Sequence, residues 1–281
     1  MAKRAVIPPT KSQNSFRCRT IAHRFLDLER EEGFPVTDAE YETLDGIIAE
    51  AESKLKVKSP DSKTKAVTAL RNIHKLLSKK GFRYQSLRSL SQALKSGGSN
   101  CITSSFIYKA IAETLGLPIV FSRAPAHLFI RWRFKDDHIN WETTSTPAGE
   151  CSDEYYKKIF SLAQSSIAKG VYLNDLTETE TSGLLQAHIG YMLHMNKEIN
   201  RAIDHYKKAL VLYPKHAETH HNFGVALAMK GEHCAAIEAF TTAIELHPLS
   251  RDTYNKRSIA YHKIGEKEKA IDDTYAAFEL Q

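Results

Sequence analysis

Apolar residues recur three and four positions apart through much of the first hundred residues, which is the spacing of one face of a helix. This periodicity predicts a helix over 16–32 and a second one after the capping sequence that starts at Thr37. Two further helices are expected between the break at Pro60 and the glycines at 97–98. Residues 1–14 are polar and include two adjacent prolines, so we expect a disordered tail there.

The pattern changes from helix to strand in the middle of the chain. A glycine turn and the capping residue Asn100 precede a helix that should begin at Cys101. Over 126–134 and 139–144, apolar side chains then alternate with polar ones. This alternation predicts two strands that pair antiparallel across the polar turn at 135–138.

Three more elements complete this region. Residues 119–123 are expected to add a third strand, and a loop should follow at 145–149, close to the end of the second strand of the pair. A helix capped by Ser152 is predicted to run to about Ala168. We expect a sheet of at least three strands against a lobe of helices.

From Gly183 onward the sequence repeats with a period of 34 residues. Small residues recur where paired helices would touch, and aromatic residues recur beside them, which is typical of tetratricopeptide repeats. Three repeats are predicted over 183–281, and the third is more polar than the others. The matching positions include Gly190, Gly224 and Ser258; Ala202, Ala236 and Ala270; and Tyr206, Phe240 and Thr274.

The predicted fold class is therefore α+β, with a helical N-terminal lobe and a small antiparallel sheet, followed by an all-α repeat array. We expect three parts: the tail over 1–14, a domain over 15–170 and the repeats over 183–281.

Charge is distributed unevenly along the chain. The net charge is +6, and the excess of Lys and Arg lies between Lys54 and Lys95, after an acidic stretch over 27–52. The two segments can be solvated helical faces that attract one another, or the basic one can be a docking surface for an acidic partner. No zinc-finger, basic-zipper or RNA-binding signature accompanies the charge, so nucleic acid is not an expected partner.

Nothing in the sequence predicts a membrane span or a cleaved signal peptide. The four cysteines show neither close pairing nor metal-ligand spacing, which fits a reducing compartment. We expect a cytoplasmic protein, although export without a cleaved signal would leave no mark in the sequence.

One cysteine occupies a position that favours chemistry. Cys101 should be the first residue of its helix, where unpaired amide N–H groups and the helix dipole favour a thiolate. In the predicted strand pair, the start of one strand lies beside the end of the other, which brings His127 and Glu142 to the same end of the sheet. The carboxylate would orient the imidazole, and the imidazole would accept the proton of the thiol.

This order of features resembles the transglutaminase-like branch of the papain-type fold, and more closely the SirB-type proteins, in which tetratricopeptide repeats follow such a core. The resemblance rests on Cys101 at a helix start, a Leu-Gly-Leu-Pro stop, a strand that opens with His127 and the Trp-Glu-Thr-Thr sequence at 141–144. It implies that Cys101 is the nucleophile, His127 the base and Glu142 the third member of a triad. The wider family usually has aspartate at that third position, so Asn140 is a substitute candidate.

The activity implied by the resemblance is acyl transfer from an amide through a thioester. Water as the acceptor would make the protein a protease or a glutamine deamidase, and an amine would make it a cross-linking enzyme. The oxyanion hole would include the amide of Cys101 and a second donor, for which Asn100 and Gln92 are candidates. No cofactor is expected, and no metal, because His216 and His220 lie one helical turn apart without a third ligand.

A competing hypothesis is a catalytically inactive adaptor that binds a protein partner through the repeats. In either case we expect the concave face of the repeats to bind a protein or peptide. Repeats that clamp chaperone C-termini need Lys and Asn where this chain has Ala187, Tyr191 and Asp252, which argues against that partner. The expected groove residues are Tyr191, Met195, His221, Asn222, Val225, Asn255, Lys256 and Ile259, together with Leu184, Ala187, Glu218 and Asp252.

Overall fold

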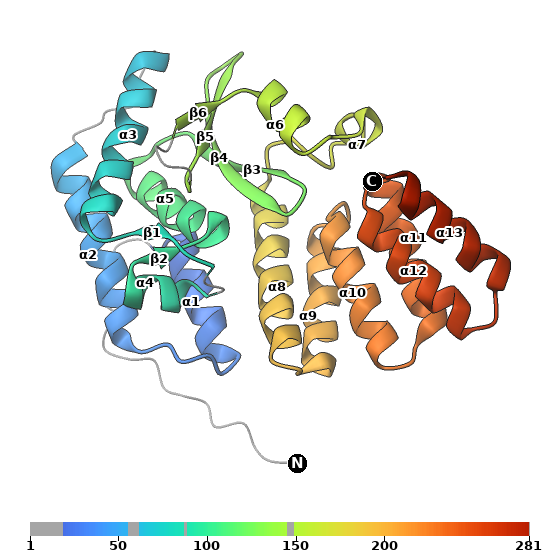
Figure 1. The fold of residues 1–281 in the computed structure, drawn as a ribbon. Coiled ribbons are helices and arrows are strands. Elements are labelled where there is room, and N and C mark those ends of the chain that lie inside the picture. Colours follow the sequence, from blue (N-terminus) through green and yellow to red (C-terminus); the bar gives the residue numbers. More distant parts are fainter. Residues whose placement is uncertain (1–18, 56–61, 87–88, 145–148, 281) are drawn as a thin grey trace.

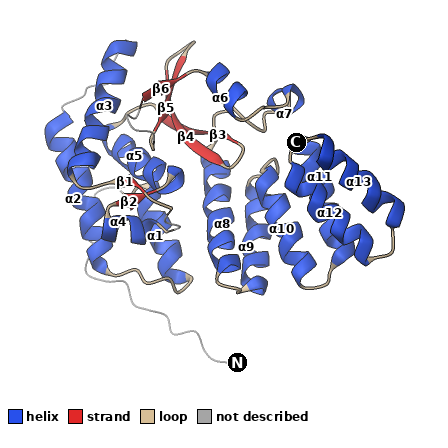
Figure 2. Ribbon diagram, in the orientation of Figure 1, coloured by secondary structure: helices blue, strands red, loops and turns tan. Residues whose placement is uncertain are grey.

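The computed structural model describes residues 19–55, 62–86, 89–144 and 149–280. It has the predicted fold class, an α+β part followed by an array of paired helices that curves away from it (Figure 1). Figure 2 shows that every strand precedes the array. The tail predicted over 1–14 and most of the loop predicted at 145–149 lie outside the described residues.

A lobe of four helices opens the described chain, as the apolar periodicity predicts. The backbone N–H and the hydroxyl of Thr37 both donate to Glu40, which forms the expected capping contact. The fully buried carboxylate of Glu29 accepts the N–H groups of Leu90 and Ser91 and caps the fourth helix. The helices are α1 (Ile21–Glu31), α2 (Asp38–Leu55), α3 (Lys63–Lys79) and α4 (Leu90–Ser96), and two short parallel strands, β1 (Arg83–Tyr84) and β2 (Gly98–Ser99), lie beside them.

The central helix is α5 (Cys101–Leu115), which packs against α1, α2 and the sheet. It begins where the sequence predicts, because Gly97 ends α4 in the left-handed region at φ 74°. A Cβ at Gly97 would lie 2.9 Å from the carbonyl oxygen of Gly81, so this turn requires glycine. The N-cap of α5 is Asn100, and its C-cap is the left-handed Gly116.

The sheet has four antiparallel strands in the order β3-β4-β5-β6, one more than the minimum expected. One of its faces packs on α5, where the rings of Phe106 and Phe121 lie 4.8 Å apart. Trp132 and Trp141 are fully buried in this core. The strands are β3 (Ile119–Ala124), β4 (His127–Arg133), β5 (His138–Glu142) and β6 (Gly149–Cys151), and Arg131 pairs with Asn140 in the register of β4 and β5.

The opposite face of the sheet is also covered. The single helix predicted from Ser152 to Ala168 is wrong, because two short helices, α6 (Asp153–Ile159) and α7 (Gln164–Ala168), occupy the segment. Ser161 between them has a φ of 46°, which a continuous helix does not permit. The ring of Tyr156 on α6 stacks on Phe129 at 4.0 Å, and both rings belong to a second, smaller hydrophobic core.

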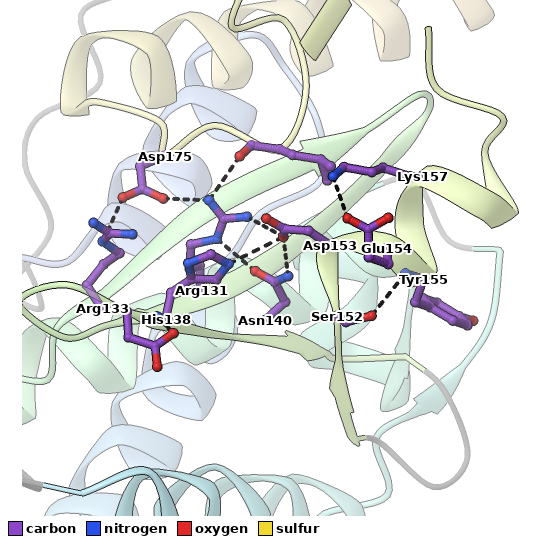
Figure 3. Close-up of polar contacts among 12 residues, drawn as sticks. Arg131, Arg133, His138, Asn140, Ser152, Asp153, Glu154, Tyr155, Lys157 and Asp175 are labelled. Carbon is purple, nitrogen blue, oxygen red and sulfur yellow. Dashed lines mark hydrogen bonds and ion pairs between the residues drawn. The ribbon is translucent and has the colours of Figure 1, made fainter. Parts of the chain in front are cut away.

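A buried arginine ties this covering segment to the sheet (Figure 3). Arg131 on β4 is only 3% exposed, and its guanidinium donates to Asn140, Asp153, Asp175 and the carbonyl of Leu173 at 2.7–3.0 Å. All three guanidinium nitrogens therefore have partners, which offsets the cost of burying the charge.

The repeat array consists of three antiparallel helix pairs, in agreement with the 34-residue period. A Cβ at Gly190 would lie 2.8 Å from the ring of Tyr206, and one at Gly224 would lie 2.7 Å from Phe240, so small residues do mark the helix contacts. The array starts at Glu178, before the predicted Gly183. The helices are α8 (Glu178–Met195), α9 (Ile199–Leu212), α10 (Ala217–Met229), α11 (His233–Leu246), α12 (Arg251–Lys263) and α13 (Lys267–Glu279).

Ion pairs account for part of the charge pattern. Lys80 lies 2.7 Å from Glu50, and Lys95 lies 3.6 Å from Glu40, so the basic segment contacts the acidic one. These pairs favour the interpretation of two mutually attractive faces. Of the helices in the described ranges, none is both long and apolar enough to cross a membrane.

Candidate functional site

Cys101 is the first residue of α5 and is half-buried. The side chain of Asn100 accepts the N–H of Thr103 at 2.9 Å and so fixes the start of the helix. The amides of Cys101 and Ile102 belong to the first turn, where N–H groups have no carbonyl partner within the helix. The thiol therefore lies at the end of the helix where the dipole favours negative charge.

The pairing of β4 with β5 brings an imidazole and a carboxylate together. His127 opens β4 and Glu142 closes β5, and the Nε2 atom of His127 lies 2.6 Å from a carboxylate oxygen of Glu142. Cys101 is close enough to the imidazole to raise its pKa. Because Glu142 occupies Nε2, the nitrogen left for the thiol is Nδ1.

These contacts change the charge state of the imidazole. Burial lowers the pKa of His127, but the hydrogen bonds and charges of Cys101 and Glu142 outweigh it and raise the pKa to about 10. Burial raises the pKa of Glu142, but its contacts with His127 and Thr144 outweigh burial, so the pKa of Glu142 is lowered. At neutral pH the pair is therefore an imidazolium and a carboxylate.

Three further residues hold the pair in place. The hydroxyl and the backbone N–H of Thr144 donate to the second oxygen of Glu142 at 2.8 and 3.1 Å. The hydroxyl of Tyr156 donates to Glu142 at 3.5 Å, and the ring of Phe160 stacks on His127 at 5.4 Å. Sequence reasoning missed Tyr156 and Phe160, although the uninterrupted apolar run at 128–130 signals a strand that is buried on both faces.

The other candidate residues have different positions. Asn100 caps α5 and lines the cavity described below. Asn140 donates to Asp153 at 2.6 Å and accepts from Arg131 at 2.7 Å, so its amide is engaged in the network of Figure 3 rather than at His127. Gln92 is exposed on α4 and is not among the residues that line the cavity.

A cavity of about 490 Å³ lies between the two parts of the molecule. Asn100, Ile102 and His127 line it from the first part, and residues of α8, α10, α11 and α12 line it from the concave side of the repeats. Of the expected groove residues, Leu184, Ala187, Tyr191, Glu218, His221, Asn222 and Asp252 line this cavity, whereas Met195, Val225, Asn255, Lys256 and Ile259 do not.

The cavity wall carries an ion pair and a carboxylate that contacts a histidine. Arg123 forms an ion pair with Glu218, and His221 lies 3.3 Å from Asp252. Burial and, to a smaller extent, the charge of Arg123 lower the pKa of His216 to about 3. His216 is therefore neutral at physiological pH, and because burial also lowers the pKa of His221, the carboxylate of Asp252 lies beside a neutral imidazole. Within the described ranges, no three His, Cys, Asp or Glu side chains form a group that could hold a metal ion.

Fold and site together define an α+β domain with a cysteine at the start of its central helix and a histidine–glutamate pair on its sheet, joined to a helical repeat array. Residues 38–148 match the family model described as "Transglutaminase-like superfamily". The chain thus contains a transglutaminase-like domain, and Cys101, His127 and Glu142 all lie within the matched residues. The 34-residue period and the six paired helices identify the part that follows as tetratricopeptide-like repeats.

Solved tetratricopeptide structures are similar to part of the chain. The first TPR of Spaghetti (RPAP3), solved with an HSP90 peptide, has 21% identity and a TM-score of 0.35, over 35% of this chain and 79% of that one. MamA has 27% identity and a TM-score of 0.35, over 37% of this chain and 56% of that one. The OM64 TPR domain of Arabidopsis has 19% identity and a TM-score of 0.36, over 37% and 85%. No curated protein sequence matches the chain significantly.

Proposed function

We propose that this protein is a cysteine acyl-transfer enzyme that acts on an amide of a protein or peptide. The observation that carries the proposal is the imidazole of His127, which is paired at 2.6 Å with the carboxylate of Glu142 and whose pKa is raised by both Glu142 and Cys101. A thiol without a chemical role does not need a neighbouring imidazole that is itself oriented by a carboxylate.

In the proposed reaction the thiolate of Cys101 attacks the carbonyl carbon of the amide. The tetrahedral oxyanion forms beside the first turn of α5, where the amide of Cys101 can donate to it. The imidazolium of His127 then gives its proton to the departing amine as the carbon–nitrogen bond breaks. A thioester remains on Cys101, and water or a second amine attacks it and restores the thiol.

Glu142 orients the ring and keeps it protonated until the amine leaves. Its carboxylate is held by Thr144, and this fixes the position of Nε2 and hence of Nδ1. Asn140 is committed to Arg131 and Asp153 and plays no part in this proposal.

The substrate that fits the cavity is a short peptide segment without acidic side chains. A volume of about 490 Å³ holds a few residues, and the wall pairs Arg123 with Glu218. Burial lowers the pKa of His216 and His221, so an acidic side chain would find no unpaired positive charge among the described residues that line the cavity. Neutral imidazoles and the amide of Asn222 can bond to peptide groups. The repeats thus form a wall of the substrate site and need no separate groove to recruit the substrate.

Alkylation of Cys101 by iodoacetamide between pH 5 and pH 9, followed by mass spectrometry, tests the proposal. Cys101 should react fast well below the pKa of about 8.5 of a free thiol, and His127→Ala should remove that advantage. The exposed Cys234 on α11 is an internal reference for an ordinary thiol.

A Cys101 that reacts like Cys234, with or without His127, would count against catalysis. The adaptor hypothesis would then explain the chain better, with the repeats binding a partner and Cys101→Ala leaving the function intact. Product analysis with and without an added amine distinguishes hydrolysis from cross-linking, because a hydrolase releases a carboxylate, whereas a cross-linking enzyme joins the acyl group to the added amine in a new amide.

A further inference from the structure

The turn between β3 and β4 carries an unusual backbone conformation directly before the proposed base. Ala126 has a φ of 52°, in the left-handed region, and the next residue is His127. An alanine in this region costs on the order of 1 kcal/mol relative to the right-handed region, and only glycine adopts it freely. The orientation of His127 therefore depends on contacts that hold the turn.

One such contact comes from the repeat array. The backbone N–H of Ala126 donates to a carboxylate oxygen of Glu218 at 3.0 Å. Glu218 lies 92 residues further along the chain, in the first turn of α10. The sequence predicted this residue for an open binding groove, but the structure places it against the loop that leads into the proposed base.

Glu218 is itself fixed on several sides. Its other oxygen forms an ion pair with Arg123, whose side chain is 4% exposed. The hydroxyl of Tyr172 donates at 3.2 Å to the same oxygen that accepts the N–H of Ala126. Burial raises the pKa of Glu218, but Arg123, His216 and the N–H of Ala126 outweigh burial and lower it to about 2. The carboxylate therefore stays ionised through the whole physiological range.

The same contact joins both sides of the strand pair. Arg123 is the residue before Ala124, which pairs with His127 in the register of β3 and β4. Glu218 thus bonds to the next-to-last residue of β3, Arg123, and to the turn residue that precedes His127 on β4. A side chain with these two contacts fixes the direction in which β4 starts.

We infer that Glu218 is a positioning residue for His127, so that the repeat array supplies part of the catalytic geometry of the transglutaminase-like domain. The inference rests on the proposed function, because it assigns Glu218 a role through the proposed base. Glu218 acts through the backbone of Ala126 and does not touch the reacting atoms.

A matched pair of variants isolates the contact with Ala126. In Arg123→Met/Glu218→Gln the ion pair is replaced by neutral side chains and an oxygen acceptor remains for the N–H of Ala126. In Arg123→Met/Glu218→Leu the ion pair is replaced in the same way but the acceptor is lost. The rate of Cys101 alkylation at pH 6 should be roughly fivefold lower in the leucine variant than in the glutamine variant, the effect of one net hydrogen bond.

Arg201→Gln is the control for a general weakening of the contact between the repeats and the first part of the molecule. Arg201 on α9 also bridges the two parts of the molecule, with an ion pair to Glu32 at 2.8 Å, but it does not contact the turn before His127. It should leave the pH profile of Cys101 alkylation unchanged. Equal rates in the leucine and glutamine variants, or an equal loss in Arg201→Gln, would overturn the inference.

Two additions keep the test decisive. If the leucine variant does not fold, Glu218→Asp keeps the charge but cannot reach both Arg123 and Ala126, and an unchanged profile in this variant overturns the inference. The titration of the His127 ring, followed by NMR, is a readout that does not need a reactive Cys101. An inert Cys101 in the wild type refutes the proposed function, whereas an identical His127 titration in the leucine and glutamine variants refutes the role of Glu218.

Discussion

At the scale of single residues, the site depends on a charge pair that is mostly buried. The side chains of His127 and Glu142 are 17% and 10% exposed, and each moves the pKa of the other toward its charged form. Both effects exceed the cost of burial, so the pair stabilises the fold only while both groups are charged.

The pair of His127 and Glu142 should make the free energy of unfolding fall as the pH rises above neutral. The pKa of His127 is raised from 6.5 to about 10, so its contribution is complete below about pH 6.5 and is lost as the pH rises toward 10. Urea denaturation at several pH values should show this decline in the wild type and a weaker one in His127→Gln. Parallel curves for the two proteins would contradict the assignment.

Glutamate at position 142 should not be exchangeable for the shorter aspartate. Its carboxylate reaches His127 at 2.6 Å from the end of β5, and aspartate lacks one methylene of that reach. We expect Glu142→Asp to lower Cys101 alkylation at pH 6 roughly tenfold, the effect of about one unit in the pKa of the ion pair. A variant that reacts as fast as the wild type would show that the backbone adjusts.

At the scale of elements, the small residues of the repeats are set by the distance between paired helices. Gly224→Ala would place a Cβ 2.7 Å from the ring of Phe240 and should lower the free energy of unfolding by about 1–3 kcal/mol. Gly46→Ala on α2 is the control, because a Cβ there meets nothing within 4 Å. It should raise stability by up to about 1 kcal/mol through helix propensity. Thermal unfolding of both variants tests the contrast.

Elements whose signals are local could be predicted from the sequence. The periodicities located the helices and the strand pair, the Asn100 cap located the start of α5, and the alternation of side chains brought His127 beside Glu142. Each of these features depends on residues close in the chain or on one simple pairing rule.

Features that depend on distant contacts could not be predicted. Nothing near Ser161 announces its left-handed conformation, and β6 is only three residues long, too short for a periodic signal. The contact of Glu218 with Arg123 joins residues 95 positions apart. The 34-residue period identifies the residues on the concave face of the array but does not say what that face contacts.

At the scale of the whole molecule, the repeats and the transglutaminase-like domain share a cavity. Asn222 on α10 lines it, whereas Asn255 on α12, expected in the same groove, does not. Asn222→Ala should therefore raise the KM for an acyl-donor peptide about fivefold, the effect of one hydrogen bond, and Asn255→Ala should have little effect. Equal changes in the two variants would show that the peptide lies along the array outside the cavity.

The shared cavity also affects how the protein can diverge. Where a binding module is merely tethered to an enzyme, exchanging the module changes the target and leaves the chemistry alone. Here a new set of repeats would have to provide a carboxylate at the position of Glu218 and a wall that fits beside His127. Substitutions at single lining positions such as His221 are the easier route to a new specificity, since they alter the ligand surface without changing how the two parts fit together.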